Sequence, residues 1–107
     1  MNPTIISIRE LYNDGSTIYI YYNHAMGSYV SYGISAFNVS KFIRPTLSYS
    51  EDFLMPVAYY DENSFMLLKD RFTIVKDQTG DWELRTPVAF DEELYKKWVE
   101  MIIPTNT

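Results

Sequence analysis

The chain has no cysteine among its 107 residues. Disulfide bridges, cysteine nucleophiles, thiolate-bound zinc and iron–sulfur clusters are therefore excluded. Residues 1–8 also lack the basic stretch followed by an apolar core that is typical of a secretory signal peptide. Because proteins of reducing compartments do not depend on disulfides, we expect a cytoplasmic protein.

Histidine and glycine are almost as scarce. His24 is the only histidine, and no G-x-S-x-G nucleophile motif accompanies it. A metal site would need mostly carboxylate ligands, and the acidic residues are scattered along the chain. The four glycines have neither the G-x-G-x-x-G nor the P-loop spacing. We therefore predict no metal and no cofactor, and the sequence favours a non-enzymatic protein over an enzyme.

Basic residues are also few. Nine Lys and Arg residues against fourteen Asp and Glu residues give a net charge of -5. Nucleic-acid binding draws much of its free energy from neutralising phosphates, and anionic membranes attract basic segments. No apolar run approaches the ~20 residues that cross a bilayer. We expect neither nucleic acid nor membrane among the partners.

Aromatic residues, in contrast, are plentiful. They make up 17% of the chain, and ten of them are tyrosines. Hydrophobic residues amount to 47%, which is enough for a chain of this length to bury a core as one domain over residues 1–107. Because the tyrosine ring is amphipathic, it suits both a half-buried sheet face and a binding surface.

The first third of the chain predicts a three-stranded antiparallel meander. β-branched and aromatic residues favour strands, and Asp14-Gly15 and Gly27 favour tight turns between them. The predicted strands are residues 4–11, 17–22 and 29–34.

The clearest of these strands alternates two kinds of side chain. Ile18 and Ile20 share one parity, and Tyr19 and Tyr21 share the other. Successive side chains of a strand point to opposite faces, so we expect the isoleucines in the core and the two tyrosines on the other face.

The middle of the chain is less regular. Ser35 is suited to cap a short helix that ends before Pro45, and residues 46–52 form a polar loop in this interpretation. Pro56 interrupts the apolar segment 53–60, which predicts an edge strand open to self-association. Residues 61–70 fit a helix or a strand, and acidic capping residues at the start favour the helix.

The last third predicts a hairpin and a helix. Strands 72–76 and 82–88 flank a loop that contains Gly80. Residues 91–103 have a capping aspartate and an apolar stripe centred on Trp98, which we expect to be buried against the sheet. Proline ends this helix, so residues 104–107 should fray.

These segments together predict an α+β fold. We expect an antiparallel sheet of about five strands, made of the N-terminal meander and the C-terminal hairpin. The C-terminal amphipathic helix should pack on one face of this sheet, and one or two short helices should connect the two halves.

The function that these features favour is that of a small accessory or interaction protein. Its partner would be an unknown protein or a second copy in a homodimer, because tyrosine is enriched at interfaces. Cross-strand tyrosine pairs that merely stabilise the sheet are the competing interpretation. The tyrosines of the expected binding surface are Tyr19, Tyr21, Tyr29, Tyr59 and Tyr60.

An alternative function depends on His24. A histidine on a loop beside a glycine could serve as an acid, a base or a ligand. The alternative is therefore a small-molecule-binding domain or modest enzyme, with a pocket between sheet and helix that uses tyrosine, His24 and a carboxylate.

The charge balance yields a first prediction. We expect no binding to duplex DNA or RNA at physiological salt, since the basic residues are few and dispersed. Fluorescence anisotropy titrations with labelled duplexes would check this. Salt-sensitive binding at micromolar concentration or below would contradict it.

Overall fold

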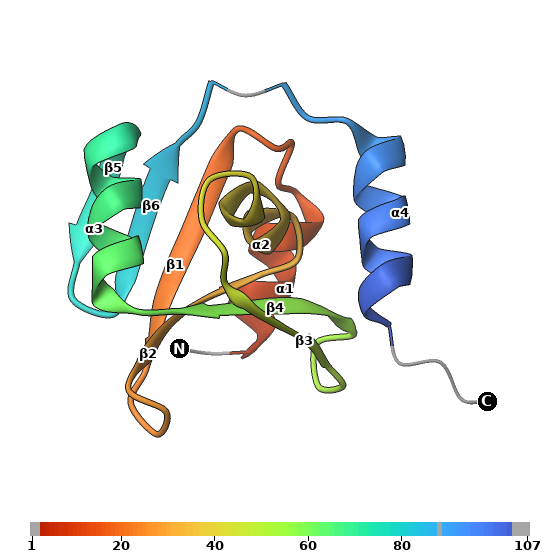
Figure 1. Cartoon of the computed structure of the whole chain (residues 1–107), viewed down its shortest axis with the longest axis horizontal. Coiled ribbons are helices and arrows are strands. Elements are labelled where there is room, and N and C mark those ends of the chain that lie inside the picture. Colours follow the sequence, from red (N-terminus) through yellow and green to blue (C-terminus); the bar gives the residue numbers. More distant parts are fainter. Residues whose placement is uncertain (1–2, 88, 104–107) are drawn as a thin grey trace.

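A computed structural model describes residues 3–87 and 89–103. Within these residues, four helices surround one six-stranded sheet (Figure 1). In chain order the elements are α1 (Pro3–Leu11), β1 (Thr17–Asn23), β2 (Ser28–Tyr32), α2 (Gly33–Ser40), β3 (Thr46–Ser50), β4 (Met55–Tyr60), α3 (Glu62–Arg71), β5 (Thr73–Gln78), β6 (Asp81–Arg85) and α4 (Glu92–Ile102).

The strands lie in the order β3-β4-β2-β1-β6-β5, and each neighbouring pair is antiparallel. Strand β1 is interior, because it pairs with β2 through Tyr22 and Tyr29 and with β6 through Ile20 and Trp82. The α+β class, the antiparallel sheet, the C-terminal hairpin and the C-terminal helix are confirmed, with six strands in place of about five.

The predicted alternation of β1 is confirmed, and it separates two layers of core. Ile18 and Ile20 are fully buried and belong to the layer under α2 and α3. Tyr21 is buried on the opposite face, where Ile6 of α1 packs with it, and Tyr19 packs at the margin of that cluster. Both faces of the sheet are therefore covered over β1.

The predicted first strand is wrong, because residues 3–11 form helix α1. Three isoleucines favour a strand locally, but the helix places Ile6 and Glu10 on one buried face, one turn apart. Gly15 then leads from α1 into β1 with φ of +90°, and a Cβ there would collide with Phe90. Asp14-Gly15 therefore joins a helix to a strand, not two strands of a meander.

A buried carboxylate joins α1 to α2. Ser35 donates its backbone N–H (3.0 Å) and its hydroxyl (2.6 Å) to the Glu10 carboxylate, and Asn13 donates its side-chain amide (3.3 Å). The Ser35 hydroxyl also accepts the backbone N–H of Tyr19 in β1 (2.9 Å). The prediction that Ser35 caps a helix is thus wrong, since α2 already begins at Gly33 and Glu10 satisfies the amide of Ser35.

Residues 46–60 differ most from expectation. The predicted polar loop contains strand β3, and β4 is an interior strand between β3 and β2 instead of an edge. Pairing with β2 ends at Val57, so Pro56 lies just beyond the part of β4 that has a neighbour on each side. The edge that was expected to promote self-association is therefore covered by β3.

The predictions for two helices and for the C-terminal hairpin are confirmed. Asp61 caps α3 by accepting the N–H of Ser64 (2.8 Å), which favours the helix over the strand for this segment. Asp91 caps α4 in the same way through the N–H of Leu94 (3.1 Å). Strands β5 and β6 form the predicted hairpin, with a bulge between Ile74 and Lys76.

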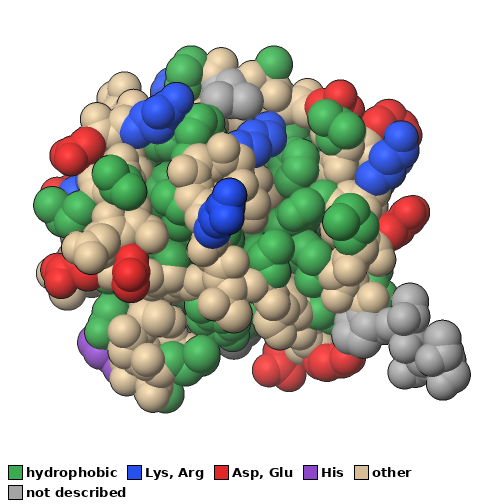
Figure 2. Space-filling view, viewed as in Figure 1, with side chains coloured by type: hydrophobic (Ala, Val, Ile, Leu, Met, Phe, Trp, Pro, Cys, Tyr) green, Lys and Arg blue, Asp and Glu red, His purple; other side chains and the backbone are tan. Residues whose placement is uncertain are grey.

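Helix α4 lies at the end of the molecule opposite α3 (Figure 1). Trp98 is only half-buried and packs on Phe37 of α2, with ring centroids 5.3 Å apart. Trp98 packs against the core cluster that contains Ile18 and Ile20, as expected, but the expectation that it is buried there is wrong, because its ring stays partly exposed. Figure 2 shows hydrophobic side chains reaching the surface between α2 and α4.

The predicted strand over residues 82–88 is too long, because β6 ends at Arg85 and residues 86–87 lie outside any strand. Val88 and the frayed tail expected at 104–107 lie outside the described residues. Among the helices of residues 3–87 and 89–103, none has the length and apolar character needed to cross a membrane.

The contrast between core and α4 gives a second prediction. Leu84 is fully buried, so Leu84→Ala should lower the free energy of unfolding by about 2–5 kcal/mol. Met101 lies on the apolar stripe predicted for the C-terminal helix but is 83% exposed. Met101→Ala should therefore change the free energy of unfolding by less than about 0.5 kcal/mol. Urea melts of both variants check this, and equal losses would show that the Met101 side chain is buried.

The Glu10 carboxylate gives a third prediction. Burial raises its pKa from 4.5 to about 7, despite the hydrogen bonds from Ser35 and Asn13 that lower it. The folded chain therefore binds more protons than the unfolded chain between these values. Stability from this group is fully present below pH 4.5 and is lost as the pH rises through 7, by about 3 kcal/mol in total.

Glu10→Gln should remove this contribution to the pH dependence. The difference in unfolding free energy between the variant and the parent, measured by urea melts from pH 5 to 8, should therefore change with pH up to about 7 and level off above it. Comparing the two proteins cancels the contributions of all the groups that both contain. A difference that is constant over this range would contradict the prediction.

Candidate functional site

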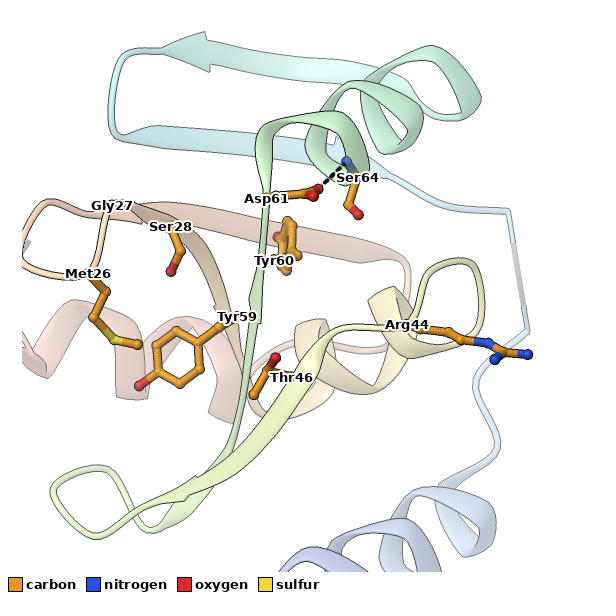
Figure 3. Close-up of a pocket in the computed structure, with 9 residues that line it drawn as sticks. All are labelled: Met26, Gly27, Ser28, Arg44, Thr46, Tyr59, Tyr60, Asp61 and Ser64. Atoms are coloured by element: carbon orange, nitrogen blue, oxygen red, sulfur yellow. Dashed lines mark hydrogen bonds between the residues drawn. The ribbon is translucent and has the colours of Figure 1, made fainter.

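Two neighbouring hollows lie where β1 turns into β2 and β4 runs into α3. The first has a volume of about 410 Å³ and the second about 380 Å³. Both are lined by Gly27 and Asp61, so they adjoin across these two residues, and we call the pair the two-part groove. The first hollow also contacts Met26, Ser28, Tyr59, Tyr60 and Ser64 (Figure 3), and the second contacts Tyr22, His24, Tyr29, Glu62, Gly80 and Trp82.

The turn between β1 and β2 sets the shape of the groove. Asn23 stabilises it by accepting the N–H of Met26 on its side-chain oxygen (3.2 Å). Gly27 has φ of +63°, a left-handed conformation that favours glycine. This turn brings Tyr22 directly opposite Tyr29 and leaves no side chain at Gly27, where the two hollows adjoin.

The second hollow is lined by a continuous series of aromatic rings. Tyr22 meets His24 and Tyr29 edge-on, at centroid distances of 4.9 and 5.1 Å. Tyr29 stacks on Phe65 of α3 at 4.0 Å and lies 5.4 Å from Trp82 of β6. These rings come from four parts of the chain, and each is held by another, so the lining is preformed.

A hydrogen bond orients the last ring of this series. The indole N–H of Trp82 donates to a carboxylate oxygen of Asp77 at 2.8 Å. Asp77 also lies 3.6 Å from the ammonium of Lys69. The orientation of Trp82 is therefore fixed by packing on one side and by a polar contact on the other.

Negative charge lies along the second hollow. Its charged lining residues are Asp61 and Glu62, and no lysine or arginine is among the lining residues described. The backbone N–H of Ser64 lowers the pKa of the Asp61 carboxyl, so this group is ionised at neutral pH. Asp61 thus caps α3 and contributes a charge to both hollows (Figure 3).

The first hollow is formed largely by hydroxyl-bearing residues. Tyr60 is buried, its hydroxyl lies 2.7 Å from the hydroxyl of Ser31, and burial raises its pKa. The buried hydroxyl oxygen of Ser28 has no hydrogen-bond partner among the residues that the structure describes. Arg44 also lines this hollow, but Figure 3 shows its guanidinium extending away from Tyr59 and Tyr60.

The structure divides the predicted tyrosine surface. Tyr29, Tyr59 and Tyr60 line the two-part groove. Tyr19 and Tyr21 lie on the sheet face under α1, and Tyr21 is 3% exposed with its hydroxyl accepting from Arg9 (3.3 Å). The five residues therefore do not form one continuous exposed face.

The residues of the alternative pocket come together. His24 lies in the second hollow with Tyr22 and Tyr29 from the sheet and Glu62 from α3. Both carboxylates there, Asp61 and Glu62, are exposed, and the hollow is open to solvent. Among the described residues, no three His, Cys, Asp or Glu side chains are close enough to hold a metal.

Sequence reasoning missed two main residues of the second hollow. Tyr22 could have been found, because a turn centred on residues 24–27 pairs Tyr22 with Tyr29 at equal distances from it. Trp82 reaches the site only through the pairing of β6 with β1, which no local pattern reveals. No protein-family model, curated protein or solved structure matches the chain, so the groove is interpreted from its own geometry.

Proposed function

We propose that the chain is a non-enzymatic interaction protein that binds an extended segment of a partner protein in the two-part groove. The observation that carries this proposal is the adjoining arrangement of two open hollows, one of them lined by aromatic rings. A compact small molecule would occupy one hollow, whereas an extended segment can fill both by passing over Gly27, which has no side chain to block it.

The lining of the groove supports binding in two further ways. Tyrosine and tryptophan are enriched among the residues that dominate interface energetics, and the groove presents Tyr22, Tyr29 and Trp82. These rings are already held by packing, so binding orders few side chains and loses little conformational entropy.

We further propose that the protein acts in the cytoplasm, which the lack of cysteine supports. A second copy of the chain remains one form that the partner could take. Because β3 covers the edge of β4, a homodimer would have to form through the groove and not through that strand edge.

A second candidate function is small-molecule binding, with or without catalysis. It is favoured by the presence of His24, Tyr22 and Glu62 in one hollow, because these residue types serve as acid, base and ligand. A ligand of this kind would bind in the second hollow alone.

The fourth prediction tests peptide binding with two matched tyrosine variants. Random peptides displayed on phage would be selected on the protein, and the enriched sequences measured by calorimetry. Tyr22→Ser should weaken their binding about tenfold or more, since it removes a ring from the groove. Tyr12→Ser, at a position 80% exposed and outside both hollows, should leave it unchanged.

Melting curves must show that the Tyr22→Ser variant is folded, and sedimentation of the parent protein alone identifies any self-association. Peptides whose binding depends on Tyr12 and not on Tyr22 would contradict the proposal. A small molecule that binds in the second hollow while no peptide is selected would favour the second candidate instead.

A further inference from the structure

We propose that the second hollow receives the cationic side chain of an arginine or lysine from the partner segment. This inference rests on the proposed function and adds the chemistry of the bound segment.

The aromatic rings of the second hollow are suited to attract a cation. The face of an aromatic ring carries partial negative charge and attracts a cation within about 6 Å of its centre. Tyr22, Tyr29 and Trp82 line one hollow and meet at tilted or edge-on angles. A side chain that enters the hollow therefore meets rings from more than one direction.

Other aromatic rings of this chain are already paired with cations. Elsewhere in the described chain, lysine and arginine lie over aromatic rings at centroid distances between 4.6 and 5.9 Å. None of the cation–ring contacts among residues 3–87 and 89–103 involves Tyr22, Tyr29 or Trp82. The pairs are Arg9 with Tyr19 and Tyr21, Lys41 with Phe37, Lys69 with Phe65, and Arg71 with Phe42.

The charged residues that line the second hollow are both acidic. Asp61 and Glu62 both line the hollow, and the described lining has no lysine or arginine to neutralise them. Lys69 of α3 is engaged with the Phe65 ring and with Asp77. A cation in the hollow would therefore gain attraction from two carboxylates as well as from the rings, and the net charge of -5 favours its approach.

A side chain of a polypeptide fits this hollow better than a free ammonium compound. The hollow is open and adjoins the first hollow across Gly27, so a cationic side chain can enter while its backbone continues along the groove. The apolar stem of lysine or arginine would lie against the rings, and the charged end would face the carboxylates.

The fifth prediction uses a tripeptide pair that differs in charge and hardly in shape. Acetyl-Gly-Arg-Gly-amide and its citrulline counterpart would be titrated while the indole signal of Trp82 and the ring signals of Tyr22 and Tyr29 are followed by NMR. The arginine peptide should bind about fivefold more tightly or better, the size of a partly desolvated cation–ring contact.

Two variants with the same net charge locate the cation. Glu62→Gln should weaken binding of the arginine peptide about twofold or more and reduce its salt dependence. Glu51→Gln removes an exposed carboxylate in the turn between β3 and β4, outside both hollows, and should have no effect.

Three results would overturn the inference. They are equal binding of the citrulline peptide, equal losses from the two glutamate variants, and tetramethylammonium binding as tightly as the arginine peptide. Peptides selected on the groove that contain no basic residue, yet lose affinity in Tyr22→Ser, would refute the inference and leave the proposed function standing. If no peptide depends on Tyr22, the proposed function itself fails.

Discussion

Strand β1 lies between β2 and β6 and has packed side chains on both of its faces, so it must serve two layers at once. A strand can do this only by alternation, with Ile18 and Ile20 toward α2 and α3 and Tyr21 toward α1. A shift of one residue in its pairing would exchange the two layers, which fixes the register of its neighbours. The same alternation continues to Tyr22, where the helices no longer cover the strand fully and the ring lines the groove. Core and site are thus consecutive parts of one pattern.

The features that could be predicted from the sequence are those that short segments determine by themselves. The alternation of β1 and the caps at Asp61 and Asp91 depend on neighbours within a few residues. Helix α1 could not be predicted, because the contact that holds Glu10 comes from Ser35, which is distant in the sequence and invisible to local propensity. Strand β3 was missed for a related reason, since an exposed edge strand needs no apolar pattern. At the site, single residues were identified from composition, but their grouping depends on strand pairing and on the packing of α3.

Asp61 shows how closely the site depends on the fold. It directly follows β4, caps α3 and lines both hollows. Because one carboxylate has all these roles, replacing it would alter the helix and the groove together, and its effect on binding could not be assigned. Glu62 contributes charge to the second hollow without a capping role, and so it reports on recognition more cleanly. The aromatic lining likewise has two roles. Tyr29 and Trp82 pack on Phe65 of the core, and they also line the second hollow.

The pairing of β1 with β6 has a consequence for the synthesis of the chain. During translation β1 and β2 leave the ribosome early, whereas β6 follows only after β3, β4, α3 and β5. Until then the side of β1 that later pairs with β6 has free backbone N–H and C=O groups beside an isoleucine-rich face. An exposed strand edge of this kind can join the same strand of another nascent chain. Slow translation between β2 and β6 would therefore favour aggregation of this protein, and fast translation of that stretch would protect it.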